Sequence, residues 1–530
     1  MNINILDCTL RDGGYINQWK FGKKCITNTL KRLSTAGIEI IEAGFLDDTL
    51  DNYSGNNTVF SDIESAEKLI DADKNNYVLM IMHGKYDAEK LSQYSDGKIK
   101  GIRYCFKKEA TDEALKKCRI ILNKGFDVYL QPASLTDYSD KEIISLVEKA
   151  NLLKIKVFYM VDTYGLMRRD EVIRYFYIID NNLKDGVPIG FHSHNNLQLS
   201  FSNSQALIEI NKKRDIYIDS SVFGMGRGAG NLCTELLTQY INENVEDKYD
   251  LIPILEIMDE HIMPIYTQHP WGYSAPYCLA AINNCHPNYA TFLMDKQTLC
   301  IRDINSIIKS IPAEKKHLYD SDLINELYIE YQQRNINDSE VVAKISALCA
   351  NRTVLILAPG KSLLTMRNAI QSYIDENDPV IFAINHIPDQ YKYDKVFTSN
   401  LKRFKSIDDA AKKIKDKLIF ASNITDDSTY DIVNYSDYLV NDEAISDNSG
   451  LMLINVLRKA GVNSFALAGY DGFKYDENTN YFDNKMINNV QYEKQQVINK
   501  AIIGYFTKLR KSAEVKFITP TIYDGGADYE

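Results

Sequence analysis

The first 230 residues alternate short β-branched runs with longer amphipathic segments, and no other feature limits the fold as strongly. Eight runs are typical of buried strands: 3–8, 38–45, 77–82, 102–106, 126–131, 156–162, 188–194 and 216–223. Between them, segments such as 25–37, 112–125 and 140–154 repeat apolar residues every three to four positions, as amphipathic helices do. This pattern fits a (β/α)8 barrel, although a doubly wound open sheet has the same local pattern.

The alternation stops near residue 240 and resumes at residue 351. A chain of 530 residues is long enough for more than one domain. The resumed strand candidates are 353–360, 379–385, 395–400, 417–422 and 464–472. We therefore predict an α/β protein with a TIM barrel over 1–240, a helical extension over 241–335, a linker over 336–350 and a Rossmann-like α/β domain over 351–530. The helical extension is the surface through which we expect a homodimer.

Charge and cysteine usage exclude several classes of protein. The formal charge is 61 − 72 = −11, which provides no general attraction for a phosphodiester backbone, so we expect no nucleic-acid partner. No stretch of eighteen apolar residues and no signal-peptide pattern occurs, so we expect no membrane span and no secretion. The nine cysteines show no CxxC spacing, and an odd number cannot all pair within one chain. We expect reduced thiols in a cytoplasmic protein.

Polar residues gather where the predicted strands end, which is where barrels carry their chemistry. The first strand runs into an Arg11-Asp12 pair, and the seventh ends in His192 and His194. Histidines two apart on a strand point to the same face and can bind one metal ion, although two surface histidines near a loop would give the same pattern. A glycine-rich run, 224–231, follows the eighth strand. In a closed barrel the first, seventh and eighth strands are neighbours.

Four of these segments resemble the motifs of the metal-dependent lyase and condensing-enzyme barrels. They are 7–13 (DCTLRDG), 162–165 (DTYG), 192–195 (HSHN) and 228–235 (GAGNLCTE). That family includes 4-hydroxy-2-oxovalerate aldolase, hydroxymethylglutaryl-CoA lyase and the isopropylmalate synthases. The resemblance covers about residues 1–300 and implies the closed barrel.

The resemblance implies a divalent metal site. Asp12, His192 and His194 would be its ligands, with the side-chain oxygen of Asn231 as a fourth. Two imidazoles with oxygen ligands and no thiolate suit Mn, Mg, Co or Zn, and the family favours Mn or Mg. The metal would act as a Lewis acid on a 2-oxo acid such as pyruvate and stabilise its enolate.

The resemblance also implies roles for residues around the metal. Arg11 would stabilise the oxyanion, although a structural ion pair in the barrel mouth is the alternative. Thr163 would hydrogen-bond the substrate carboxylate. The related aldolases carry a histidine base three positions after the metal aspartate, whereas this chain has Tyr15. Tyrosine is a poor base at neutral pH unless its pKa is lowered, so we expect Tyr15 to contact or donate to the substrate. Tyr289 is a candidate acid, and a packing tyrosine is the alternative.

The C-terminal region carries a second resemblance. Residues 354–363 (VLILAPGKSL) predict a strand, a glycine turn and a helix, an arrangement that can place backbone N–H groups against phosphate. With the later SGLMLIN and ALAGYDGF segments, the region resembles nucleotide-binding domains of bacterial sialyltransferase-like and pterin-diphosphokinase-like proteins. The candidate ligand-binding residues are Gly360, Ser362, Asn385, Ser449, Gly450 and Asp471.

The leading hypothesis is a metal-dependent aldolase or lyase that acts on a 2-oxo acid with an aldehyde or acyl partner. The C-terminal domain would bind a nucleotide, a nucleotide sugar or a phosphorylated acceptor, and such a bifunctional fusion would suit glycan biosynthesis. One alternative is a Claisen-type condensing enzyme that uses an acyl-CoA. The other is a non-catalytic barrel that serves as a scaffold for a glycosyltransferase-like C-terminal domain.

Overall fold

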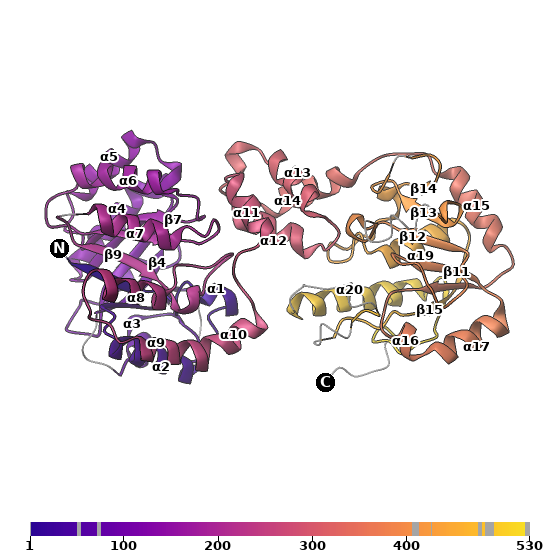
Figure 1. Ribbon diagram of the computed structural model, residues 1–530, viewed down its shortest axis with the longest axis horizontal. Helices are drawn as coiled ribbons and strands as arrows, with labels where there is room; N and C mark the ends of the chain where they lie inside the picture. The colour runs from indigo at the N-terminus through magenta and orange to yellow at the C-terminus, as the bar shows by residue number, and fades with distance from the viewer. Residues whose placement is uncertain are drawn as a thin grey trace. The chain divides into compact units, whose positions relative to one another are not determined.

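A computed structural model describes residues 2–49, 55–71, 76–211, 213–404, 413–425, 427–474, 480–482 and 492–524 (Figure 1). The chain forms two compact units, 1–287 and 288–530. The boundary therefore lies inside the predicted helical extension rather than at residue 335. The reason is packing, because Ile254, Ile257 and Ile262 belong to the core of the first unit.

Eight parallel strands form a closed barrel in the first unit. They are β1 Ile3–Asp7, β2 Ile40–Leu46, β4 Asn76–Met82, β5 Ile99–Phe106, β6 Asp127–Pro132, β7 Val157–Asp162, β8 Ile189–Ser193 and β9 Ile216–Ser220. Strand β1 pairs with both β9 and β2, which closes the sheet and excludes the open-sheet alternative. All eight strands lie where the sequence predicts them, and a short β3 (Val59–Phe60) pairs beside β2.

Helices surround the barrel, and their apolar faces pack on the strands (Figure 1). They are α2 Lys23–Thr35, α3 Ile63–Glu67, α4 Thr111–Asn123, α5 Asp140–Ala150, α6 Arg169–Asn182, α7 Ser200–Ile210 and α8 Thr234–Asn244. A four-residue helix α1 (Gly14–Asn17) follows β1, and α9 Leu251–Ile257, a π-helical turn Met258–Ile262, α10 Met263–Gln268 and α11 Ala275–Ile282 complete the unit. The start of helix α5 is fixed by a capping box. The Ser139 side chain accepts a hydrogen bond from the Glu142 N–H, and the Glu142 side chain accepts one from the Ser139 N–H.

The second unit is built on one parallel sheet of seven strands in the order β14-β13-β12-β11-β10-β15-β16. These are β10 Val354–Leu357, β11 Val380–Ile384, β12 Lys395–Thr398, β13 Leu418–Ala421, β14 Asp431–Val433, β15 Ser464–Ala468 and β16 Glu514–Phe517. The sequence predicts five of them. It misses β14 and β16 because β14 has three residues and β16 alternates exposed and half-buried side chains, so neither forms an apolar run.

Both faces of this sheet are covered. Along β10, Val354 and Ile356 pack in one core, and Leu355 and Leu357 pack in the other. The helices are α12 Pro287–Asp295, α13 Ile301–Ser310, α14 Ser321–Gln332, α15 Ser339–Cys349, α16 Ser362–Thr365, α17 Arg367–Asn377, α19 Ser449–Lys459 and α20 Tyr492–Leu509. The predicted linker is largely helix α15, whose Ile345 and Cys349 join the core. Among the residues described, no helix is long and apolar enough to cross a membrane.

Candidate functional site

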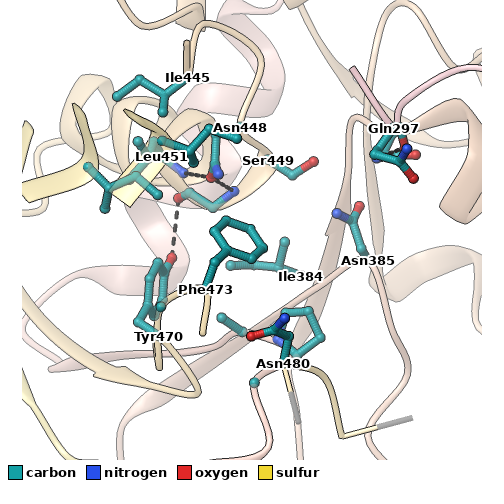
Figure 2. Close-up of a pocket in the computed structure, with 18 of the residues that line it drawn as sticks. Gln297, Ile384, Asn385, Ile445, Asn448, Ser449, Leu451, Tyr470, Phe473 and Asn480 are labelled. Carbon is teal, nitrogen blue, oxygen red and sulfur yellow. Dashed lines mark hydrogen bonds between the residues drawn. The ribbon is translucent and has the colours of Figure 1, made fainter. Parts of the chain in front are cut away.

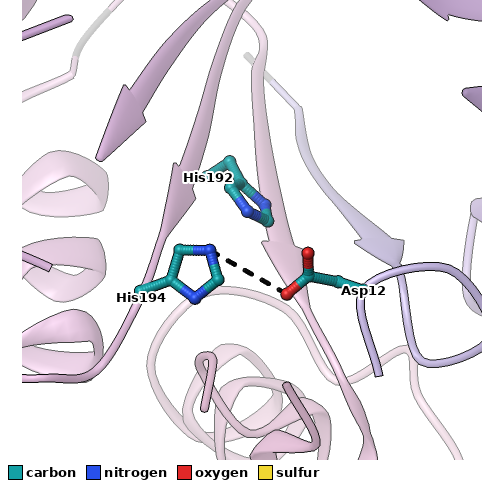
Figure 3. A group of neighbouring side chains, drawn as sticks. All are labelled: Asp12, His192 and His194. Carbon is teal, nitrogen blue, oxygen red and sulfur yellow. Dashed lines mark ion pairs between the residues drawn. The ribbon is translucent and has the colours of Figure 1, made fainter. Parts of the chain in front are cut away.

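Three side chains, from two different parts of the chain, converge at the carboxyl end of the barrel (Figure 3). Asp12 lies in the turn after β1, His192 lies on β8, and His194 directly follows it. One ligand atom from each residue lies within 4.8 Å of the others, and His194 Nε2 is 3.9 Å from Asp12 Oδ2. Asp12 and His192 are buried. Two imidazoles and a carboxylate at this spacing could hold a divalent ion.

The protonation states of these groups suit metal binding. Burial alone would raise the pKa of Asp12, but the Arg11 guanidinium and the two histidines outweigh it and hold the pKa below its ordinary value. Burial lowers the pKa of His194 to about 4. At neutral pH the carboxylate is therefore ionised and the imidazole is neutral, which are the forms that coordinate a metal.

Asp219 on β9 orients His192. Its Oδ2 lies 2.9 Å from His192 Nδ1, which leaves Nε2 of the ring for a ligand. Such a carboxylate partner fixes the tautomer and the orientation of a metal-binding histidine. Asp219 is itself held by the guanidinium of Arg103 on β5.

Asn231 completes the cluster from the glycine-rich loop. Its amide nitrogen donates to Asp12 Oδ2 at 2.6 Å and to the Met225 carbonyl at 3.1 Å. Its oxygen is buried and has no hydrogen-bond partner among the described residues, which suits an oxygen that meets a bound ion or its water. A Cβ on Gly226 would lie 2.4 Å from the Asn231 amide nitrogen, so only glycine lets the loop pass this close.

Arg11 joins the cluster to a buried ion-pair network. Its Nε donates to Glu42 Oε2 at 2.7 Å, and its Nη1 donates to Asp12 Oδ1. Arg103, whose side chain is 0% exposed, binds the same Glu42 oxygen at 2.6 Å and also binds Asp219. Arg11 Nη2 is buried and makes no hydrogen bond to a described residue, so this nitrogen can still donate to an oxyanion.

Sequence reasoning missed Arg103 and Asp219. Arg103 is the single charged residue in the otherwise apolar segment IRYCF, and Asp219 is the single charged residue in the segment IYIDSS. A lone charge in the middle of a strand that is otherwise apolar is the signal that could have found them, because such a charge must be paired.

The other strand-end acids do not reach the histidines. Asp7 accepts from the Thr9 N–H and from the Thr234 hydroxyl. Asp162 accepts the backbone N–H groups of Leu166 and Met167. Both carboxylates hold loops at the barrel mouth, whereas Glu42 holds the two arginines.

Tyr15 and Thr163 both lie at the barrel mouth. Burial raises the pKa of Tyr15, so its hydroxyl keeps its proton at neutral pH, and its role as a donor to the substrate stays a prediction. The only hydrogen bond that the described residues offer this hydroxyl is a long one, 3.9 Å to Met82 Sδ. The Thr163 hydroxyl accepts the Ser134 N–H at 2.8 Å, which leaves its own proton available for a substrate oxygen.

Tyr289 does not have the geometry of a free acid. It belongs to the second unit and is fully buried. Its hydroxyl donates toward the carbonyls of Lys315 and Leu318 and accepts from the Asp320 N–H. The prediction of a catalytic acid is therefore corrected to its alternative, a packing tyrosine that ties α12 to the segment before α14.

The second unit has a cavity of about 250 Å³ that gathers most of the residues predicted to bind a ligand. It opens beyond the carboxyl ends of β10, β11, β12 and β15, next to the point where the strand order reverses between β10 and β15. In open α/β sheets this is the usual ligand position. Gly360, Asn385, Ser449, Gly450 and Asp471 line it. Figure 2 shows Asn385 and Gln297 across the cavity from Asn448 and Ser449.

Two N–H groups of the glycine turn are bonded within the protein and are not free for a phosphate, in contrast to the prediction. The Gly360 N–H donates to the Gly469 carbonyl at 3.0 Å. The Ser362 N–H donates to Asp471 Oδ2 at 2.8 Å, and the Ser362 hydroxyl binds the other oxygen of that carboxylate. Asp471 is thus an internal anion in the place where we expected a phosphate. Ser362 supports this residue and does not line the cavity.

Comparison with known proteins relates the first unit to a described family. Residues 2–260 match the family model described as HMGL-like. A 4-hydroxy-2-oxovalerate aldolase of Geobacillus genomosp. 3 is 27% identical over 50% of this chain and 77% of its own length. 4-Hydroxy-2-oxovalerate aldolase 6 of Rhodococcus jostii (strain RHA1) is 25% identical over 51% and 76%, and that of Marinomonas sp. (strain MWYL1) is 28% identical over 49% and 77%. These relationships support an enzyme of the aldolase or lyase type, and the N-terminal part of the chain matches the HMGL-like family model.

Proposed function

We propose that the barrel is a divalent-metal-dependent aldolase or lyase that breaks or forms a carbon–carbon bond of a 2-oxo acid through its enolate. The observation that carries the proposal is the convergence of Asp12, His192 and His194 beside two buried polar atoms, Asn231 Oδ1 and Arg11 Nη2, that have no hydrogen-bond partner among the described residues. The relatives named 4-hydroxy-2-oxovalerate aldolase support the same chemistry.

The residues around the cluster would divide the work. A bound Mn²⁺ or Mg²⁺, with Co²⁺ or Zn²⁺ as alternatives, would supply Lewis-acid stabilisation of an enolate. Asp12, His192 and His194 would hold it, with Asn231 as a further oxygen ligand. Arg11 would donate its free Nη2 to the enolate oxygen, and Glu42 would keep that guanidinium in place. Thr163 would donate its hydroxyl proton to the substrate carboxylate.

Metal removal tests the proposal directly. The full-length protein, dialysed against EDTA, should lose exchange of the pyruvate methyl protons for deuterium, followed by proton NMR. Adding Mn²⁺ or Mg²⁺ should restore the exchange, because enolate formation needs the Lewis acid. Metal analysis of protein purified without chelator should find about one ion per cluster. Exchange that survives complete removal of the metal would contradict the proposal.

Two alternative functions remain to be distinguished from the aldolase. One uses the same metal cluster for catalysis, and the other makes no catalytic use of it. A Claisen-type condensing enzyme would release free CoA from acetyl-CoA and a 2-oxo acid, which a thiol reagent detects, whereas the proposed aldolase would not. A non-catalytic scaffold would show neither product. One buried acceptor, Asn231 Oδ1, and one buried donor, Arg11 Nη2, have no partner among the described residues, and this argues against a scaffold, because unpaired buried polar atoms are costly when no ligand uses them.

We propose further that the cavity of the second unit binds a nucleotide, a nucleotide sugar or a sugar phosphate. Aromatic rings of Tyr470, Phe473 and Tyr481 line it together with the cationic side chains of Lys296 and Arg403. The Asn385 side-chain oxygen is buried without a partner among the described residues, and its backbone has φ of 58°, a conformation that asparagine tolerates and function often exploits. Because Asp471 already occupies the glycine turn, we place the anionic part of the ligand near Arg403 and Lys296.

Calorimetric titration of the full-length protein with nucleoside diphosphates and nucleotide sugars tests this cavity. Replacing Asn385 by Ala should weaken binding by roughly 10-fold, because a buried hydrogen bond is lost. The control is Asn377→Ala, whose amide only bonds the Tyr373 carbonyl on the same helix. If no nucleotide or sugar phosphate binds, or if both variants bind equally well, the cavity has another role.

A further inference from the structure

Arg227 lies at the barrel mouth, in the glycine-rich loop beside the metal cluster. A Cβ on the preceding Gly226 would lie 3.0 Å from Asp12 Oδ2, so the loop passes directly over that carboxylate. Arg227 itself is half-buried. A group held by Arg227 would therefore lie next to a substrate bound at the cluster.

The Arg227 guanidinium is stacked on an aromatic ring. Its Cζ lies 4.2 Å from the centroid of the Tyr15 ring. That ring is braced by the edges of Trp19, at 4.8 Å between centroids, and of Phe45, at 6.2 Å. Stacking uses a flat face of the guanidinium and leaves the N–H groups at its edge free to donate. The ring thus orients the cation without satisfying its hydrogen bonds.

Arg227 has no anionic partner in the part of the chain that the structure describes. No ion pair and no side-chain hydrogen bond links it to another described residue, and its guanidinium lies over the ring of Tyr15. Arg11 differs, because Asp12 and Glu42 both neutralise it. Within the described residues, therefore, Arg11 is already paired, whereas Arg227 is available to an anion from outside. A planar guanidinium in this state is suited to a carboxylate or a phosphate.

We propose that Arg227 is a specificity-determining residue that binds the anionic group of the acceptor aldehyde. The inference rests on the proposed aldolase function. In the addition step, the enolate carbon bonds to the aldehyde carbon and the aldehyde C=O double bond becomes a single bond. The aldehyde oxygen takes up one proton, which balances the proton that the methyl group of the 2-oxo acid lost when the enolate formed. Arg227 exchanges no proton and only holds the far end of the acceptor. Arg11 serves the oxygen of the 2-oxo acid, so each substrate has its own arginine.

Matched aldehydes test the assignment in the Mn²⁺-loaded full-length protein with pyruvate. One pair is D-glyceraldehyde 3-phosphate and D-glyceraldehyde, and the other is succinic semialdehyde and butanal, so phosphate and carboxylate are tested separately. The wild type should prefer at least one anionic member in kcat/KM. Arg227→Ala should reduce that preference by roughly 10- to 100-fold, mainly through KM, because charge-assisted hydrogen bonds are lost. Arg227→Lys should retain part of it, since the charge remains without the planar fork.

A binding measurement gives a second readout that does not depend on turnover. Glycerol 3-phosphate and succinate, which have no reactive carbonyl, should bind the metal-free wild type more tightly than glycerol in calorimetry, and Arg227→Ala should remove the difference. The control is Arg174→Ala, whose guanidinium pairs with Asp140 on the outer helices. A wild type without pyruvate deuterium exchange would point to failure of the aldolase proposal. The role of Arg227 would be overturned by a different result. In that result the wild type exchanges the pyruvate protons, but Arg227→Ala lowers kcat/KM equally for the anionic and the neutral aldehydes.

Discussion

His194→Ala will reduce turnover of a 2-oxo acid by about 10³-fold or more, because Lewis-acid stabilisation of the enolate is worth several kcal/mol and each 1.36 kcal/mol is tenfold in rate. The bound metal should fall in parallel, measured by elemental analysis after gel filtration. The circular-dichroism spectrum should stay nearly unchanged, since His194 lies at the barrel mouth after β8 and not in the strand core. His192→Ala should lose bound metal and turnover in the same way.

The matched control is His269→Ala. His269 follows α10 and lies outside the metal cluster, so its loss should change neither the metal content nor the rate. If His194→Ala retained both metal and turnover, the cluster would have no catalytic role. If the variant unfolded instead, the cluster would be a structural site.

Arg103→Met will lower the free energy of unfolding of the barrel by about 3–5 kcal/mol, because it leaves two buried carboxylates without their partner. Arg103 is 0% exposed and binds both Glu42 and Asp219. Urea denaturation followed by circular dichroism measures the effect, with the barrel transition analysed separately from that of the second unit. Metal affinity should also fall by about 10- to 100-fold, since Asp219 positions His192.

A comparison isolates the effect of burial. Arg32→Met breaks ion pairs with Glu256 and Glu260 that remain partly exposed, and it should cost about 1 kcal/mol or less. In the double variant Arg103→Met with Glu42→Gln, much of the lost free energy of unfolding should be recovered, because one unpaired buried charge is removed. Equal costs for the Arg103 and Arg32 variants would show that the interior network adds no more than a surface pair.

The barrel and its cluster could be predicted because local patterns carry them. Strand periodicity locates all eight strands, and it places Asp12 after β1 and the two histidines at the carboxyl end of β8, which is the same end of the barrel. Closure could not be read from periodicity alone, because it depends on the pairing of β1 with both β2 and β9. The resemblance of the motifs supplied it.

The remaining errors come from contacts between residues far apart in sequence. The pairing of Arg103 with Asp219 spans 116 residues, and no local pattern reports it. The role of Asp471 depends on Ser362, 109 residues earlier, so the glycine turn looks like a phosphate site until that carboxylate is placed. Tyr289 was assigned by a loose match of one segment, and only the carbonyls of Lys315 and Leu318 show that it is a packing residue.

The closure of the barrel also has a consequence for how the protein is made. Asp12 lies in the turn after the first strand, Asn231 lies 219 residues later in the loop after the last strand, and the two side chains are hydrogen-bonded to each other. During synthesis, the complete ligand set can form only after nearly the whole barrel has left the ribosome. An ion bound there would link the beginning of the domain to its end. Metal binding would therefore follow the folding of the barrel and would not initiate it.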